Sequence, residues 1–251
     1  MKSVTDKSSR VTSRNAAIDL LRSLPLFSGL DETEIEVFAA ASRSRTLVKG
    51  QNLYLEGEVA QYFYVIIAGW IKLLHVTESG DEVILAMISK LAVTGESSLF
   101  ENGHHAATAQ IVEDALILSL PIALLKSQIA SNTKLAINMM TSMIQYQRRH
   151  EMQVEQFLLY SAPQRIGCFI LDLCLVQNHR DGFELELPYD KRLIANLLGM
   201  KGPTFSRALN ILRDATGTKI TGTHVTISSI KKLLLYVDGC YLSHHVIKTH
   251  K

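Results

Sequence analysis

The sequence predicts an α+β protein in which a roll of short antiparallel strands is followed by one long helix, then by a helix–turn–helix with a β-hairpin. Three observations lead to this prediction. Residues 46–120 are short β-rich runs separated by turn glycines. Residues 133–159 keep a continuous helical period. Residues 190–213 have the pattern of helix, glycine turn and helix, and a hairpin pattern follows them.

The composition suits a globular protein of about two domains, since the chain has 251 residues, 47% of them apolar and 20% charged. No apolar run reaches the roughly 18 residues that cross a bilayer, and the polar first residues do not look like a secretory signal. The three cysteines form no CxxC pair. We therefore expect a cytoplasmic protein without disulfides or a membrane partner. The sequence has no P-loop, nucleophile elbow, HExxH or paired-acid motif, so we do not expect an enzyme.

We expect the chain to divide into five segments. They are a flexible arm, the roll, the long helix, the helix–turn–helix domain and a tail, at residues 1–17, 18–130, 131–160, 161–238 and 239–251. The boundary between the two domains is placed at Ala162-Pro163, because proline disfavours helix both at its own position and at the residue before it.

Two short helices are predicted before the roll. The first spans Ala17 to Phe27, and Pro25 and Gly29 are the residues that end the helical pattern. Asp31 opens the second, and Glu34 three residues later completes a capping-box pattern. The expected buried stripe of the second helix is Ile35, Phe38 and Ala39.

The roll itself is predicted from runs rich in β-branched and aromatic residues. Glycine is suited to the corners between them because it accepts positive φ without a steric penalty. The expected strands are Thr46–Val48, Asn52–Leu55, Tyr62–Ile67, Trp70–Val76, Glu82–Ile88, Ala106–Val112 and Ala115–Leu120.

The long helix is the predicted dimer interface. Pro121 starts a short helix, and Asn132 or Thr133 then caps a helix that reaches about Leu159. At 1.5 Å per residue its ~27 residues span about 40 Å, which is longer than most helices of globular proteins. Its stripe advances in steps of three and four residues, close to the 3.5-residue repeat of paired helices. We predict a homodimer through Leu135, Met139, Met143, Tyr146, His150, Val154 and Phe157. The alternative is that this stripe packs on the roll of its own chain.

The C-terminal segment reads as a small mixed domain. The expected elements are a helix at Gln164–Leu175, a strand at Glu184–Leu187, a helix at Asp190–Leu198 capped by Asp190, a helix from Gly202-Pro203 to Arg213, strands at Lys219–Thr221 and His224–Ile227, and a helix at Ile230–Val237 capped by Ser228. Ile194, Ala195 and Leu198 are expected to face Phe205, Leu209 and Leu212 across the Gly199 turn.

The second helix of this motif is a candidate DNA-reading helix. It is expected to expose Lys201, Thr204, Ser206, Arg207 and Asn210. Arginine can bond guanine O6 and N7 in bidentate fashion, and lysine and hydroxyl side chains suit phosphate oxygens. The distribution of charge agrees with DNA binding by the second half, because residues 1–160 carry a net charge of −3 and residues 161–251 carry +5. The alternative is an ordinary helical hairpin with a solvated face.

From about residue 20 to residue 237 the chain resembles the CRP/FNR family of bacterial transcription regulators. The matching segments are Leu55-Glu56-Gly57-Glu58, Ile67-Ala68-Gly69, Ser79-Gly80, Gly95-Glu96-Ser97-Ser98-Leu99-Phe100, the long helix and Thr204-Phe205-Ser206-Arg207. The resemblance implies a cyclic-nucleotide-binding-like β-roll, a dimerisation helix and a winged helix-turn-helix. It also implies a dimer that binds palindromic promoter DNA and contacts RNA polymerase.

The resemblance places an effector pocket at Gly95, Glu96, Ala106, Ala107, His150 and Glu151. Members that bind cyclic AMP carry an Arg-Ser pair, which holds the cyclic phosphate, where this chain has Ala106-Ala107. Without the arginine, the strongest charge-assisted contact is lost. The Thr-Ser pair that contacts adenine becomes His150-Glu151. We therefore do not expect a cyclic nucleotide as effector, although Glu96 remains a candidate partner for a ribose hydroxyl.

Other members of the family carry metal cofactors. An N-terminal cysteine cluster holds iron and sulfur in the oxygen sensors, but the first cysteine here is Cys168, so no iron–sulfur cluster is expected. Gly103-His104-His105 looks more like the FNR and DNR branches, and the DNR branch senses nitric oxide, with haem in some relatives. The candidate haem ligands are His75, His104, His105 and His150. The alternative places His104 and His105 in an exposed turn, His75 at a strand rim and His150 in the dimer interface.

The start of the reading helix departs from the family as well. Many members have a glutamate just before the helix threonine, and this chain has Pro203, which offers no side-chain acceptor. We expect an altered DNA half-site at that base pair. The prediction is a homodimeric DNA-binding regulator that couples an effector in the roll to promoter binding. The alternatives are a haem-based nitric oxide or redox sensor, and a ligand-binding scaffold without productive DNA binding.

Overall fold

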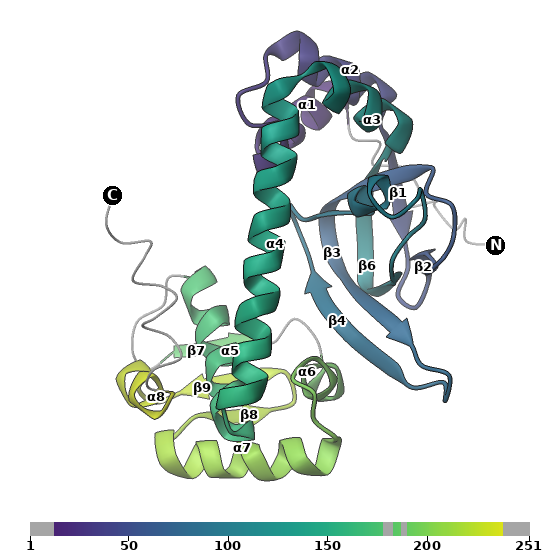
Figure 1. The fold of residues 1–251 in the computed structure, drawn as a ribbon. Helices are drawn as coiled ribbons and strands as arrows, with labels where there is room; N and C mark the ends of the chain where they lie inside the picture. The colour runs from purple at the N-terminus through teal and green to yellow at the C-terminus, as the bar shows by residue number, and fades with distance from the viewer. Residues whose placement is uncertain (1–12, 178–182, 187–189, 238–251) are drawn as a thin grey trace, which may run out of the picture. The chain divides into compact units, whose positions relative to one another are not determined.

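The structure, a computed structural model, describes residues 13–177, 183–186 and 190–237, and it forms two compact units (Figure 1). The units are Met1–Tyr146 and Gln147–Lys251, so they divide within the long helix α4 (Thr133–Leu159). The boundary predicted at Ala162-Pro163 coincides with the start of α5, and Leu135 and Met139, in the first half of α4, are buried in the core of the first unit.

Short helices open the first unit. They are α1 (Arg14–Arg22), the 3₁₀ turn η1 (Pro25–Phe27) and α2 (Glu32–Ala41). The segment expected to be one helix over residues 17–27 is therefore two, and residues 14–17 of the expected arm are helical. The Asp31 capping box is confirmed: Asp31 Oδ1 accepts from Glu34 N at 2.9 Å, and Asp31 N donates to Glu34 Oε2 at 2.7 Å.

The roll is an antiparallel sheet with the strand order β1-β6-β3-β4, with β2 on β6 and β5 on β3. Its strands are β1 (Arg43–Leu47), β2 (Asn52–Tyr54), β3 (Tyr62–Val76), β4 (Glu82–Ile88), β5 (Val93–Thr94) and β6 (Thr108–Pro121). The expected pairs of strands at 62–76 and 106–120 are single long strands. Register shifts between Ile66 and Ile71 let β3 bend past β6 without ending, which is why the glycine there looked like a strand break.

Two cores hold the first unit together. One lies under α1, α2 and α3 (Ile122–Ser131), where Phe27, Phe38 and Phe63 are fully buried. The other fills the roll with Tyr54, Tyr64, Ile66, Ile71, Ile111 and Ile117. Asn132 caps α4, as expected, because its Oδ1 accepts from Leu135 N at 3.1 Å.

The second unit joins the end of α4 to a small helical domain with a three-stranded antiparallel sheet of order β7-β9-β8. Its further elements are α5 (Ala162–Gln177), β7 (Phe183–Glu186), α6 (Lys191–Leu197), α7 (Gly202–Thr216), β8 (Lys219–Thr221), β9 (His224–Ile227) and α8 (Ile230–Tyr236). Its core includes Ile166, Ile170, Ile194, Phe205, Leu212, Val225 and Leu233.

Local capping in this unit follows the sequence with one exception. Asp190 Oδ1 accepts from Leu193 N at 2.9 Å and begins α6, as predicted. The cap of α8 is Ser229, not Ser228, whose hydroxyl donates to Gly217 O at 3.0 Å. Pro163 lies in the first turn of α5, where its missing N–H costs no helical hydrogen bond. Within the described residues, no helix is both long and apolar enough to cross a membrane.

Candidate DNA-binding surface and roll interior

A buried contact between α6 and α7 positions the candidate DNA-binding surface. Ile194 and Ala195 of α6 are buried, as are Phe205 and Leu212 of α7, while the predicted contact residue Leu209 is only half-buried. The turn between the helices contains Gly199, with φ +64°. Met200 N donates to Ala195 O at 2.8 Å and fixes the start of the second helix. The helix–turn–helix predicted from the spacing is present.

The predicted DNA-contacting side chains all lie on the exposed side of α7. Lys201, Thr204, Ser206, Arg207 and Asn210 are exposed, and Lys201 is the N-cap residue. Arg207 Nε donates to Pro203 O over a long 3.4 Å, so the guanidinium can leave this contact at little cost. Asn210 Oδ1 accepts from Arg213 Nη1 at 3.1 Å, an interaction the sequence did not indicate.

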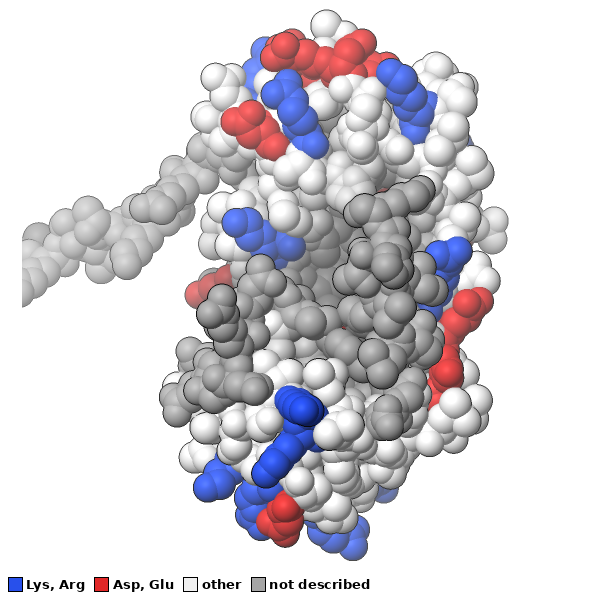
Figure 2. All heavy atoms as spheres, turned by 90° about the vertical axis from the view of Figure 1, so that its left-hand side faces the viewer, with Lys and Arg blue, Asp and Glu red and all other residues white. Residues whose placement is uncertain are grey.

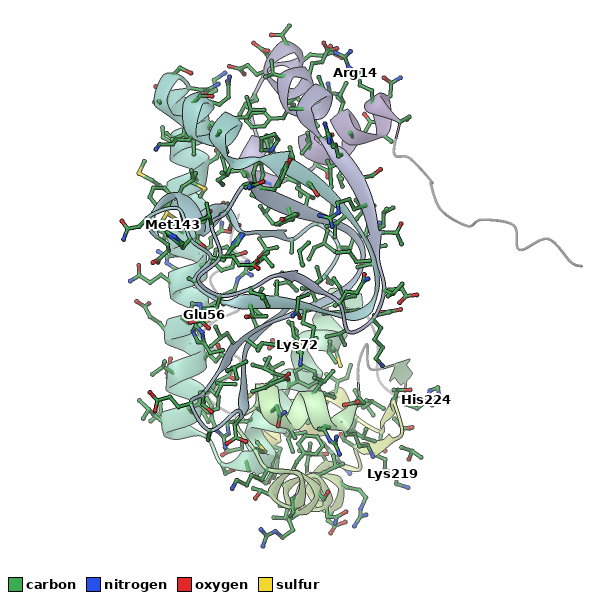
Figure 3. The ribbon with its side chains drawn as sticks, turned by 90° about the vertical axis from the view of Figure 1, so that its right-hand side faces the viewer. Arg14, Glu56, Lys72, Met143, Lys219 and His224 are labelled. Atoms are coloured by element: carbon green, nitrogen blue, oxygen red, sulfur yellow. The ribbon has the colours of Figure 1, made fainter. Side chains whose placement is uncertain are left out.

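Further basic residues surround α7. A surface cleft of about 730 Å³ between α6 and α7 is lined by Lys191, Arg192, Asn196, Lys201, Ser206 and Asn210. On the hairpin, Lys219 and His224 are exposed, and they are the first residues of β8 and β9 (Figure 3). Figure 2 shows Lys and Arg side chains at the lower end of the molecule, with an acidic patch among them. The sequence reasoning did not single out the hairpin residues, although the alternating burial of β8 and β9 is a period-2 pattern that identifies them.

Phe157 joins the end of α4 to the turn. A Cβ placed on Gly199 would lie 2.8 Å from Phe157 Cε1, so the ring packs directly against the glycine. The guanidinium of Arg165 lies over the same ring, 4.9 Å from its centroid. Phe157 had been predicted in the dimer interface, and the structure gives it these contacts within its own chain.

Three more of the predicted interface residues also contact their own chain. Leu135 and Met139 are buried in the core under the short helices, and Tyr146 donates its hydroxyl to Val93 O at 3.2 Å. Met143, Val154 and His150 are exposed. The alternative considered for this stripe, packing on the roll of the same chain, therefore describes the first half of α4.

The residues of the predicted effector pocket come from both units, and Gly95, Glu96, Ala106 and Ala107 belong to the first. Gly95, with φ +85°, precedes the 3₁₀ turn η2 (Glu96–Leu99) and presents the Glu96 carboxyl in a buried setting. Burial raises the pKa of this carboxyl above its ordinary value of 4.5. Ala106 is exposed and Ala107 half-buried. His150 and Glu151 belong to the second unit, where both are exposed on α4.

His105 occupies the space beside Gly95. Its ring stacks on Tyr54 with centroids 3.8 Å apart and planes inclined by 11°, and its Cε1 lies 3.2 Å from where a Gly95 Cβ would be. Tyr54 and Thr94 share a hydroxyl–hydroxyl hydrogen bond of 2.5 Å. Burial lowers the pKa of His105 below 6.5. The interpretation of His105 as an exposed turn residue is wrong, because the backbone of His105 is bonded to Gly57 and Glu58 across the roll.

The four candidate haem ligands are not equivalent. His75 Nδ1 is 2.8 Å from Glu56 Oε2, and His104 Nδ1 is 3.0 Å from Asn102 O. His104 and His150 are exposed, and His105 is packed between Tyr54 and Gly95. A haem ligand needs both an open coordination side and an apolar site for the macrocycle. The described contacts of His75, His104 and His105 are instead hydrogen bonds and ring packing within the roll. Those residues also contain no group of three or more His, Cys, Asp or Glu side chains that could hold a metal ion.

Comparisons with known proteins agree with this architecture. Residues 44–132 match the cyclic nucleotide-binding domain, and residues 164–236 match the Crp-like helix-turn-helix domain. The chain is 22% identical to a CRP-like cAMP-activated global transcriptional regulator of Mycobacterium tuberculosis, over 86% of this chain and 97% of that protein. It is 26% identical to the fumarate and nitrate reduction regulatory protein of Vibrio cholerae, over 82% and 83%. The fold is shared with FixK2 of Bradyrhizobium japonicum, with a TM-score of 0.69, 20% identity and coverage of 79% and 98%.

A cyclic nucleotide-binding type of roll followed by a Crp-like helix-turn-helix defines a DNA-binding transcription regulator with an effector-binding domain. The chain belongs to the CRP/FNR family of transcription regulators.

Proposed function

We propose that the chain acts as a homodimer that binds palindromic promoter DNA through two copies of α7, and that an effector in the roll controls this binding. The observation that carries the proposal is the exposed polar side of α7, whose opposite side is buried through Phe205 and Leu212. In a dimer, two such helices reach successive major grooves about one helical turn, roughly 34 Å, apart. RNA polymerase is the proposed partner at the promoter.

The exposed side chains of α7 are proposed to have two roles, base reading and phosphate binding, according to their chemistry. Arg207 is proposed to read guanine, since its guanidinium is held only by the long contact to Pro203 O. Asn210 is proposed to read a base from the position that Arg213 fixes. Lys201, Thr204 and Ser206 lie at the positively polarised N-terminus of the helix and suit phosphate oxygens. Pro203 supplies no acceptor, so the half-site should lack the base pair that a glutamate there would select.

The effector is proposed to be something other than a cyclic nucleotide. Ala106 and Ala107 offer no charge to a phosphate, and burial raises the pKa of the Glu96 carboxyl, which makes its charge easier to remove than that of an exposed glutamate. An uncharged or weakly acidic ligand fits this chemistry better than a phosphodiester. Such a ligand would have to displace or stack on His105, which lies beside Gly95.

The test is selection of DNA from a random library, followed by affinity measurements at several salt concentrations. A palindromic motif and a steep fall of affinity with salt are expected. Arg207→Ala should weaken binding about 5- to 150-fold and relax one position of the motif, as the loss of a bidentate base contact predicts. Lys231→Ala is the matched control, since it removes one exposed positive charge from α8 in the same unit.

Two results would count against the proposal. Affinity that does not respond to salt would favour the scaffold without productive DNA binding. Equal effects of Arg207→Ala and Lys231→Ala on the selected motif would remove Arg207 from base reading.

A further inference from the structure

The side chain of His105 is buried although the turn around it is exposed. Residues 101–104 and Ala106 are exposed, whereas His105 is only 5% exposed. The turn is held through the backbone, because His105 N donates to Glu58 O at 2.9 Å and Gly57 N donates to His105 O at 2.8 Å. Within the described residues, the His105 ring itself makes no hydrogen bond. The ring can therefore turn out of the roll while the backbone contacts of the turn stay in place.

The His105 ring fills a slot that is one ring thick. Tyr54 forms one wall, since the two ring planes are inclined by only 11° with centroids 3.8 Å apart. The bare backbone of Gly95 forms an edge, because a Cβ there would lie 3.2 Å from His105 Cε1. Burial lowers the pKa of His105, against the opposing effect of the Glu58 carboxylate, so the ring is mainly neutral at pH 7. The slot thus holds a flat, uncharged ring that the chain itself supplies.

We propose that His105 is a built-in occupant of the effector site, and that the effector is an uncharged molecule with a flat ring that replaces His105 against Tyr54. This inference rests on the proposed function, in which an effector in the roll controls DNA binding. Because His105 is tethered beside the slot, its effective concentration there is high, so a ligand needs further contacts to displace it. Glu96 offers one, since its buried carboxyl forms no hydrogen bond with another of the described residues.

Tyr54 connects the slot to α4. Its hydroxyl shares the 2.5 Å hydrogen bond with Thr94 of β5. The preceding residue of β5, Val93, accepts a hydrogen bond from the Tyr146 hydroxyl of α4 at 3.2 Å. All of these residues belong to the first unit. A ligand that stacks on Tyr54 in place of His105 therefore acts on the strand that holds Tyr146, and β5 carries the exchange to α4.

Imidazole tests the slot in the full-length His105→Ala variant at pH 8, where imidazole is mainly neutral. The variant removes the ring and keeps the backbone of the turn, so imidazole should bind saturably in calorimetry and raise the Tm. His104→Ala is the matched control, because it removes the exposed neighbouring ring. This control and the unmodified chain should not bind imidazole. Absence of saturable binding by His105→Ala would overturn the slot.

The charge of the ring is tested with N-methylpyridinium, which is flat but permanently charged. It should bind His105→Ala at least about tenfold more weakly than imidazole does, because the buried slot disfavours a cation. Equal binding of the two probes would overturn the assignment of an uncharged effector.

DNA affinity distinguishes a regulatory occupant from an ordinary core side chain. Saturating imidazole should change the DNA affinity of His105→Ala at least about fivefold, the lower end of typical allosteric coupling. Adding Tyr146→Phe should abolish this change and leave imidazole binding in place, since it removes the hydrogen bond to Val93. Imidazole that binds without changing DNA affinity would overturn the regulatory role of His105. An unmodified chain that binds no DNA would instead refute the proposed function, whatever imidazole does.

The unmodified chain provides a second measurement, which does not depend on whether His105→Ala folds. Benzimidazole at pH 8 is an uncharged ring system with more stacking area than imidazole, and it should displace His105 from Tyr54. In proton NMR, the His105 Cε1–H signal should move toward that of the exposed His104, because the ring leaves the face of Tyr54. A His105 signal that stays in place up to the solubility limit of benzimidazole would overturn the proposal.

Discussion

Replacing Gly199 with alanine adds one methyl group, and its effect on the free energy of unfolding measures how closely the Phe157 ring packs on Gly199. In Gly199→Ala, the new Cβ meets Phe157 Cε1 at 2.8 Å and Cζ at 3.4 Å. The φ of +64° adds a second cost, since an L-residue in this region pays roughly 1–2 kcal/mol. Phe157 is 42% exposed, so its ring can rotate away, at roughly 0.5–1.5 kcal/mol for a strained rotamer. Moving the ring also loosens its contact with Arg165, worth roughly 0.5–1 kcal/mol.

These contributions predict that Gly199→Ala lowers the free energy of unfolding of the second unit by about 3 kcal/mol. Gly222→Ala is the matched control. Its φ is +61°, and a Cβ there has no neighbour within 4 Å among the described residues, so only the backbone cost of roughly 1–2 kcal/mol applies. The measurement is urea unfolding followed by far-UV circular dichroism at one protein concentration, because the stability of a dimer depends on concentration.

A double variant isolates the ring. In a Phe157→Ala background, Gly199→Ala should cost no more than Gly222→Ala does, because nothing is left to collide with the methyl group. Equal losses for the two glycine variants in the wild-type background would refute the reasoning, since they would show that Phe157 does not rest on the turn in solution.

Three further predictions concern the roll. Burial lowers the pKa of His105 below 6.5 in the folded protein, so as the pH falls His105 is protonated in the unfolded chain before it is protonated in the folded one. The free energy of unfolding should therefore decrease as the pH drops from 7.5 to 5.5. His105→Phe keeps the ring stack on Tyr54 and should flatten this pH dependence in thermal unfolding scans. Tyr54→Phe leaves the buried Thr94 hydroxyl without its partner and should cost about 1–2 kcal/mol in urea unfolding, whereas an unchanged stability would contradict the 2.5 Å hydrogen bond. Calorimetry should detect no tight cyclic AMP binding, and Ala106→Arg should increase any residual affinity; micromolar binding by the unchanged chain would contradict the role given to Ala106.

Local signals were the most predictable from the sequence. The capping box at Asp31 and the cap at Asp190 depend only on residues three positions apart, and both form as expected. The position of His105 depends on backbone bonds to Gly57 and Glu58, almost fifty residues away in the chain. No pattern around His105 contains that information, and its turn-like neighbours favoured an exposed position.

The long helix shows a different limit of sequence reasoning. A helical period identifies an apolar face but does not say what covers it. In α4 two apolar faces lie side by side: Leu135 and Met139 pack inside the first unit, while Ile137 and Met140 remain exposed. A single stripe drawn through the sequence mixed the two, because a helix that contacts its own domain and a partner has a broad apolar arc.

The contacts of α4 also bear on how a signal reaches DNA. Leu158 is exposed near the end of α4, and its neighbour Phe157 rests on Gly199 at the turn between α6 and α7. Successive residues of a helix point about 100° apart, so any rotation of α4 about its axis that changes what Leu158 faces must also move the ring on the turn. A glycine with positive φ cannot be replaced there without strain, so the turn presents bare backbone to the ring and responds directly to its position. A rotation of the end of α4 would therefore reach the turn before α7 through Phe157.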